Sequence, residues 1–169
     1  MTTKTVDKKV KYETNIKKVA NYFLEKENMS QKKLQKMCFY AYSWYLYFNN
    51  DIETGFNSKL FPNDFEGWVH GPVSFVLYKA FPFVGSKPLK VKKSFGFINE
   101  ENASLVSFLD LVYDTFKEYT GNELEEMTHL EKPWREARIG KQLFEPGHTI
   151  LKDETIYLQC LELQNEQKD

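Results

Sequence analysis

The chain has 169 residues, of which 41% are apolar and 28% are charged. Its 14 Phe, 10 Tyr and 3 Trp can fill a hydrophobic core, so the composition excludes a wholly disordered protein. Two cysteines exclude a disulfide framework, and the lack of a membrane-length apolar run or a signal peptide leads us to expect a cytoplasmic protein. The charge is uneven along the chain. Residues 1–37 carry ten Lys and four acids (+6), residues 38–98 carry six Lys and four acids (+2), and residues 99–169 carry seven Lys or Arg and sixteen acids (−9). The negative charge of the last part argues against nucleic-acid binding over the whole surface.

The first third of the chain predicts a flexible start and two helices. Residues 1–13 are rich in Lys and Thr and are expected to form a flexible basic segment. Apolar residues spaced three and four apart then predict an amphipathic helix over about 15–28. A second helix is predicted from Ser30, its N-cap, to Phe48. From Met37 onward it is apolar on nearly every face, so we expect it to be the surrounded, central helix of the domain.

The middle of the chain predicts a small β element. Residues 65–70 alternate between two faces and predict a short extended segment. Gly71-Pro72 is predicted to open a third helix, which Pro82 ends. Residues 89–95 alternate as well, with lysines on one face, and predict an edge strand that pairs with residues 65–70 in an antiparallel sheet.

The last third of the chain is predicted to be helical. Three helices are predicted over about 100–119, about 123–129 and about 153–163, and Pro133 is predicted to begin a short helical turn between the last two. A polar tail follows over 164–169. No internal repeat or linker interrupts the sequence. The expected fold is therefore mainly α (α+β): a compact helical domain over residues 14–163, around a central aromatic-rich helix, with a small antiparallel β element.

Few residues could carry chemistry. The histidines at 70, 129 and 148 lack the local pairing of a zinc site, so neither a metal nor a cofactor is expected. Cys38 lies within the aromatic run and is interpreted as a buried structural thiol. No acyl-transfer or nucleotide-binding motif occurs, so no catalytic residue is assigned. A distributed hydrolase site that joins His129, His70 and a carboxylate stays open as an alternative.

Four segments of the chain form a pattern in their order and spacing: residues 34–46 (LQKMCFYAYSWYL), residues 65–73 (FEGWVHGPV) with Leu77-Tyr78 after them, the stretch from Leu124 through His129 to Pro133-Trp134, and residues 150–157. Together these segments resemble the Panacea domain, the family that includes SocA-type antitoxins and phage-associated GepA-like proteins. The resemblance spans about residues 15–163, with Met37-Cys38 in place of two aliphatic residues and Gly67 in place of a common Ala.

The resemblance implies a function by binding and no enzymatic activity. Family members look like antitoxins that neutralise a cognate toxin by direct contact, and some act as adaptors that deliver the toxin to a cytosolic AAA+ protease. No membrane partner is implied, and no oligomeric state. The open alternatives are the hydrolase named above and a phage- or mobile-element-encoded host regulator or nucleic-acid-binding protein. The latter would use Lys8, Lys9, Lys11, Lys17, Lys18, Lys32 and Lys33.

The predicted partner-binding residues are Trp68, His70 and Tyr78, because tryptophan and tyrosine with a polar rim are typical of interface hot spots. A helix beginning at Gly71-Pro72 would add its positive end beside Trp68 and His70. Burial of Trp68 and Tyr78 in the core is the alternative. The predicted structural residues are Gly71, Pro72, His129, Pro133 and Trp134, with His129 and Trp134 expected to lock the short helices through a buried hydrogen bond.

Overall fold

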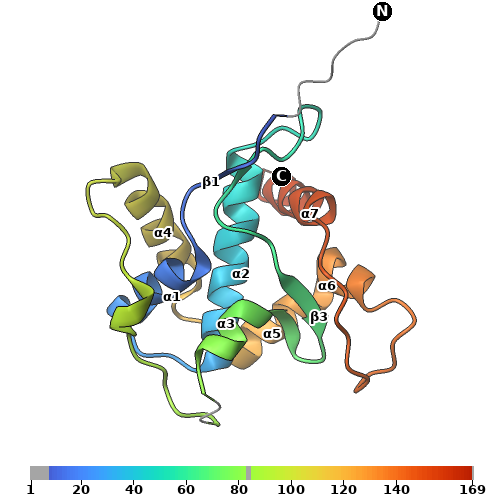
Figure 1. The fold of residues 1–169 in the computed structure, drawn as a ribbon. Coiled ribbons are helices and arrows are strands. Elements are labelled where there is room, and N and C mark those ends of the chain that lie inside the picture. Colours follow the sequence, from blue (N-terminus) through green and yellow to red (C-terminus); the bar gives the residue numbers. More distant parts are fainter. Residues whose placement is uncertain (1–7, 83–84, 169) are drawn as a thin grey trace, which may run out of the picture.

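The computed structural model describes residues 8–82 and 85–168, and over these ranges the fold is mainly α with two small two-stranded sheets (Figure 1). This confirms the predicted fold class. Along these ranges no helix has both the length and the apolar character that a membrane crossing requires.

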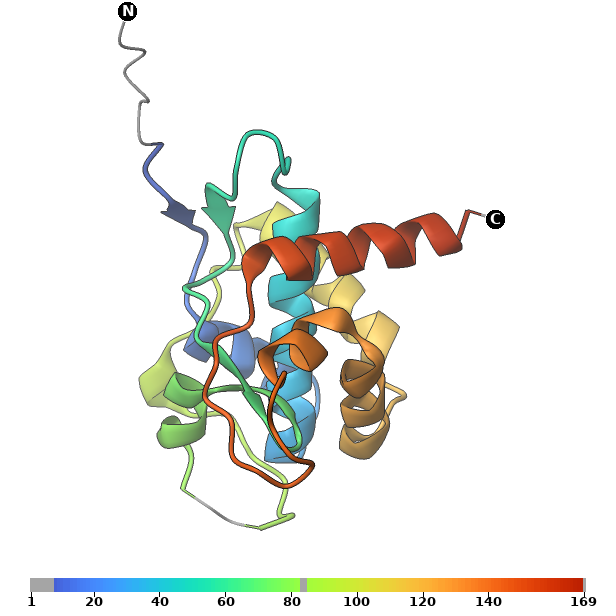
Figure 2. The same cartoon turned by 90° about the vertical axis from the view of Figure 1, so that its right-hand side faces the viewer.

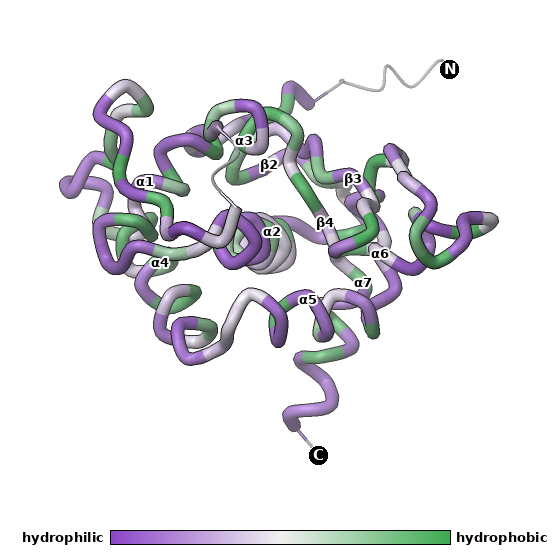
Figure 3. The backbone as a smooth tube through the Cα atoms, turned by 90° about the horizontal axis from the view of Figure 1, so that it is seen from below, coloured by the Kyte–Doolittle hydropathy of each residue, from purple (hydrophilic) through white to green (hydrophobic). Residues whose placement is uncertain are grey.

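Helix α2 (Gln31–Phe48) is the centre of the domain, as predicted. Ser30 caps it by accepting a hydrogen bond from the backbone N–H of Lys33. The helices that contact it are α1 (Ile16–Lys26), α4 (Ala103–Phe116), α5 (Gly121–Leu130) and α7 (Asp153–Glu166). Figure 3 looks along α2 and shows these elements arranged around it. Residues 37–42 are buried on every face of the helix, whereas Phe48 in the last turn is 53% exposed.

Two short helices and a 3₁₀ turn complete the helical part. Helix α3 spans Phe75–Ala80 and ends before Pro82 as predicted, while η1 spans Lys93–Phe95. Helix α6 (Lys132–Ala137) begins with Pro133 in its first turn, which also agrees with the prediction. Helix α5 begins at Gly121 with Thr120 and Glu123 as a reciprocal capping box.

The β element at the site is a hairpin, and the prediction of a helix beginning at Gly71-Pro72 is wrong. Strand β3 (Phe65–Trp68) pairs antiparallel with β4 (Gly71–Ser74), which places Pro72 opposite Gly67. The helix begins only after Ser74, whose hydroxyl accepts from the N–H of Leu77. On its other side β4 borders α2, and there the Gln35 side chain bonds both backbone groups of Ser74. No helix N-terminus therefore lies at Gly71.

The predicted edge strand over 89–95 is also wrong. Leu89 makes one isolated bridge to Met29, and the residues after it turn into η1. The buried side chain of Asn21 accepts from the N–H of Lys92 and donates to the carbonyls of Lys92 and Gly96. Because this one amide occupies backbone groups that a sheet partner would need, the segment follows α1 instead of β3.

Both ends of the domain extend further than predicted. Within the segment expected to be flexible, β1 (Lys11–Tyr12) pairs in parallel with β2 (Ser58–Lys59), and the N–H of Glu13 bonds the carbonyl of Lys59. Residues 1–7 of that segment lie outside the described residues. At the other end α7 runs to Glu166, three residues into the expected polar tail, as the long last helix in Figure 2 shows.

Candidate functional site

Backbone contacts hold the β3–β4 hairpin against α6 and the segment that follows it. The backbone of Gly67 accepts a 3.0 Å hydrogen bond from Arg138 and donates one of 2.9 Å to Thr149. There is no room for a side chain here, since a Cβ on Gly67 would lie 2.9 Å from the Cβ of Ala137. The next carbonyl, that of Trp68, accepts from Trp134 Nε1 at 2.7 Å. The peptide units on either side of Trp68 are therefore fixed.

Aromatic side chains gather on the outer face of this hairpin and on α3. We call this group, Trp68, Phe75, Tyr78 and His148, the Trp68 patch. The Trp68 ring is half-buried and meets Tyr78 edge-on at 4.9 Å, with the Phe75 and His148 rings at 6.5 and 6.1 Å. The other three side chains are exposed.

One carboxylate orients the ring of Trp68. Glu66 accepts from Trp68 Nε1 at 2.7 Å, and the same oxygen lies 2.9 Å from Nδ1 of His148. The indole N–H of Trp68 is thereby satisfied within the protein. Phe75, His148 and Glu66 were not predicted from the sequence, because the helix was expected to begin at Gly71 and the segment at 146–150 carries no pattern that places it beside the hairpin.

His70 is not part of the Trp68 patch. It lies in the hairpin turn and faces α5, where its Nδ1 is 2.8 Å from Oε1 of Glu125. Glu125 also pairs with Lys32. Burial raises the pKa of Glu125, but the hydrogen bonds from Lys32 and His70 outweigh burial and leave this pKa below its usual value. Of the three predicted partner-binding residues, the structure therefore brings together Trp68 and Tyr78 only.

His129 and Trp134 are in direct contact, but not through a hydrogen bond. Their rings stack with centroids 3.9 Å apart and 19° between the planes, while the Trp134 N–H goes to the carbonyl of Trp68. Nε2 of His129 is buried without a hydrogen-bond partner among the described residues, 3.9 Å from Glu125. Burial lowers the pKa of His129. The pair joins α5, α6 and the hairpin by stacking.

The hydrolase alternative is not supported at this cluster, although His70, His129 and Glu125 do come together. That alternative requires a carboxyl group with a raised pKa, and the pKa of Glu125 is lowered. Beside it Lys36 is fully buried, donates to the carbonyl of Pro72 at 3.2 Å, and has its pKa lowered to about 7 by burial. Cys38 is also fully buried, which raises its pKa and leaves a structural thiol. No group of three or more metal-ligating side chains occurs in the described ranges.

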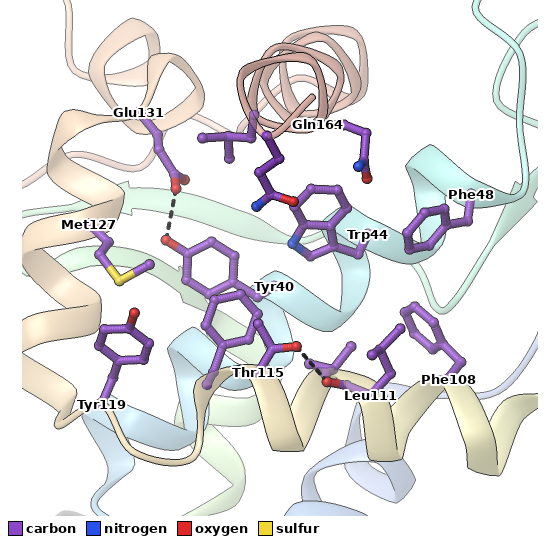
Figure 4. A pocket seen from close by; sticks show the side chains of 14 residues that line it. Tyr40, Trp44, Phe48, Phe108, Leu111, Thr115, Tyr119, Met127, Glu131 and Gln164 are labelled. Atoms are coloured by element: carbon purple, nitrogen blue, oxygen red, sulfur yellow. Dashed lines mark hydrogen bonds between the residues drawn. The ribbon is translucent and has the colours of Figure 1, made fainter. Parts of the chain in front are cut away.

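The structure also has an aromatic groove that the sequence did not predict. It has a volume of about 340 Å³ and lies between the end of α2, α4, the α5–α6 junction and the end of α7 (Figure 4). Trp44 and Phe48 line it, so the aromatic run is not enclosed along its whole length as expected. The Tyr40 hydroxyl donates to Glu131 at 2.9 Å, and burial raises the pKa of Glu131 to about 7. No histidine is among its lining residues.

Comparison with known protein families matches residues 34–135 to the family described as antitoxin SocA-like, Panacea domain. No curated protein and no solved structure matches the chain. The matched range contains most of α2, the hairpin, α3, α4, α5 and the start of α6. It therefore includes Trp68, Phe75 and Tyr78, whereas His148 lies beyond it. Because the match covers more than half of the chain, the protein belongs to the SocA-like Panacea-domain antitoxin family.

Proposed function

We propose that the protein is a non-enzymatic, cytoplasmic antitoxin that neutralises a cognate toxin protein by direct contact, with the Trp68 patch as the contact surface. Membership of the antitoxin family supports the general role. One observation carries the choice of surface: Trp68 is held in place by Glu66 and Trp134, while Phe75 and Tyr78 beside it are exposed.

A fixed aromatic cluster suits a protein interface for an energetic reason. Ordering a side chain on binding costs conformational entropy. Hydrogen bonds already order Trp68 in the unbound protein, so binding through this residue loses less entropy. Tryptophan and tyrosine are the residues most enriched among interface hot spots. The ammonium group of Lys79 lies over the Phe75 ring at 4.6 Å and supplies a charged edge to the patch.

Co-expression with the proteins encoded next to this gene tests the proposal. The chain should restore growth in the presence of one of them and co-purify with it. Tyr78→Ala and Phe75→Ala should abolish both effects because they remove exposed rings of the patch. Tyr12→Ala is the matched control, since Tyr12 is 47% exposed on β1 and Tyr78 is 37% exposed on α3. If no neighbouring protein binds, or if the Tyr12 and Tyr78 variants behave alike, the proposal is wrong.

The adaptor form of the proposal is tested by the lifetime of the toxin. If the bound toxin is delivered to a cytosolic AAA+ protease, its half-life falls when antitoxin and protease are both present. If contact alone neutralises the toxin, its half-life is unchanged or longer. Nucleic acid is not proposed as a partner, because the chain has a pI near 6.3.

A further inference from the structure

Among the residues that line the aromatic groove, only Glu131 carries a charged side chain. Six rings line it, those of Tyr40, Trp44, Phe48, Phe108, Phe116 and Tyr119. The Thr115 hydroxyl in its wall already donates to the carbonyl of Leu111 at 2.7 Å. Glu131 is different, because among the described residues its carboxylate accepts a hydrogen bond from Tyr40 alone, at one of its two oxygens. Figure 4 shows Glu131 pointing into the groove above the Tyr40 ring.

The helices around the groove are acidic. Helices α4, α5 and α7 together contain nine Asp and Glu and no Lys or Arg. Three lysines lie next to lining residues: Lys117 is paired with Asp114, Lys132 is paired with Glu162, and Lys168 is exposed beside Gln167. Exposed carboxylates that directly adjoin lining residues in the sequence include Glu118, Glu126 and Glu166. The groove is thus apolar inside and negatively charged around its rim.

We propose that this groove docks a basic amphipathic segment of a partner protein, with apolar side chains on the rings of Trp44 and Phe108 and one lysine or arginine paired with Glu131. A cation is the complement of a carboxylate that has a free oxygen, and aromatic faces attract cations as well. Burial of Glu131 raises its pKa to about 7, so a cation brought by the partner stabilises the charged form.

A small organic ligand fits these observations less well. Small-molecule sites are enclosed and bury most of their ligand, whereas Leu111 in the wall of this groove is 56% exposed. The acidic rim would add nothing for an uncharged small molecule, whereas it attracts a long basic segment along its whole length. The groove and the Trp68 patch share no residue, so this inference goes beyond the proposed toxin contact and does not depend on it.

Selection of peptides on the full-length protein tests the inference. A phage library of random 15-residue peptides is enriched on the wild-type chain, and the affinities of the enriched peptides are then measured by fluorescence anisotropy. The peptides should carry net positive charge and place apolar residues three and four apart. Leu111→Lys should weaken their binding by about tenfold or more, since Leu111 is 56% exposed in the groove wall and the new charge repels a basic segment.

Two further variants make the test specific. Leu143→Lys places the same charge on a leucine outside the groove and should leave affinity within about twofold. Glu131→Gln keeps an acceptor for Tyr40 and should weaken binding by about tenfold through loss of the charge pair. Circular dichroism confirms that each variant folds. Enrichment of neutral or acidic peptides, no enrichment, or binding indifferent to Leu111→Lys would overturn the inference.

Discussion

The Trp68 patch and the aromatic groove are both built from rings, but they differ in what their polar atoms do. In the patch, the indole N–H and the neighbouring backbone are bonded within the protein, so the rings are fixed in place. In the groove, one oxygen of the largely buried Glu131 has no hydrogen-bond partner in the part of the chain that the structure describes. The patch is organised for contact by shape, while the groove retains a charge that a partner can satisfy.

Gly147→Ala should cause the largest loss of stability, because the new methyl group would collide with the backbone that holds the hairpin under the Trp68 patch. A Cβ at this position would lie 2.7 Å from the carbonyl oxygen of Gly67 and 3.0 Å from Nη1 of Arg138. Backbone cannot yield as a side chain does, so we expect a loss of about 3 kcal/mol in the free energy of unfolding, measured by urea denaturation. Gly140→Ala is the control: it meets open space, and its positive φ alone should cost about 1 kcal/mol. Equal losses for the two variants would contradict the close approach seen here.

Glu131 should make the protein less stable as the pH rises. Its pKa is near 7 in the folded protein and 4.5 as a model value, so between these pH values the folded state binds more protons than the unfolded state. The free energy of unfolding therefore falls from about pH 5 to 7, by up to about 3 kcal/mol. Glu131→Gln removes this fall and should be the more stable protein at pH 8.

Urea titrations of both proteins at pH 5, 6, 7 and 8 measure this effect. The other titratable groups near Glu131 are Tyr40 and Cys160, and burial raises the pKa of both beyond this range. If wild type and Glu131→Gln show the same dependence on pH, Glu131 does not titrate in the groove as described.

Lys36 should act in the opposite direction and at higher pH. Its pKa is lowered to about 7 from 10.5, so the unfolded state binds more protons between these values and stability rises with pH in that window. Lys36→Met should flatten the rise. At pH 7 it should stabilise the protein by about 2 kcal/mol, because a buried amine is replaced by an apolar chain of similar length at the loss of one hydrogen bond. Thermal melts at pH 7 and 10 check this, and a less stable Lys36→Met at pH 7 would contradict it.

Trp134→Phe should have the smallest effect on stability. It keeps a ring to stack on His129 but removes the N–H that bonds the Trp68 carbonyl, which should cost about 1 kcal/mol. Amide hydrogen exchange should speed up in the β3–β4 hairpin and remain unchanged in α4. Faster exchange in both regions would show a general loosening and not a local role for this bond.

The sequence predicted what depends on local pattern and missed what depends on distant partners. Ser30 and the apolar run after it located the central helix, since capping and periodicity are read within a few residues. Gly71-Pro72 misled because proline is also tolerated at the edge of a two-stranded sheet. Gln35 stabilises the extended conformation of this segment, because its side chain bonds both backbone groups of Ser74, 39 positions away in the sequence.

The same limit applies to the two surfaces. Trp68 and Tyr78 could be predicted to share a surface because their residue types are typical of interface hot spots, but His70 could not be separated from them without knowing that it lies in a hairpin turn. The groove was missed because periodicity shows that a face of α2 is apolar and does not show whether another helix covers it. Trp44 and Tyr40 share that face and both line the groove, but Tyr40 is buried whereas Trp44 is half-buried.

The most direct test of the account is the affinity of the purified protein for its toxin, once a neighbouring gene supplies that toxin. Titration calorimetry compares Tyr78→Ala in the patch with Leu111→Lys in the groove. The account predicts that Tyr78→Ala weakens toxin binding by about tenfold or more and that Leu111→Lys changes it by less than about twofold. Tight binding by Tyr78→Ala together with weak binding by Leu111→Lys would contradict it and would move the toxin contact to the groove.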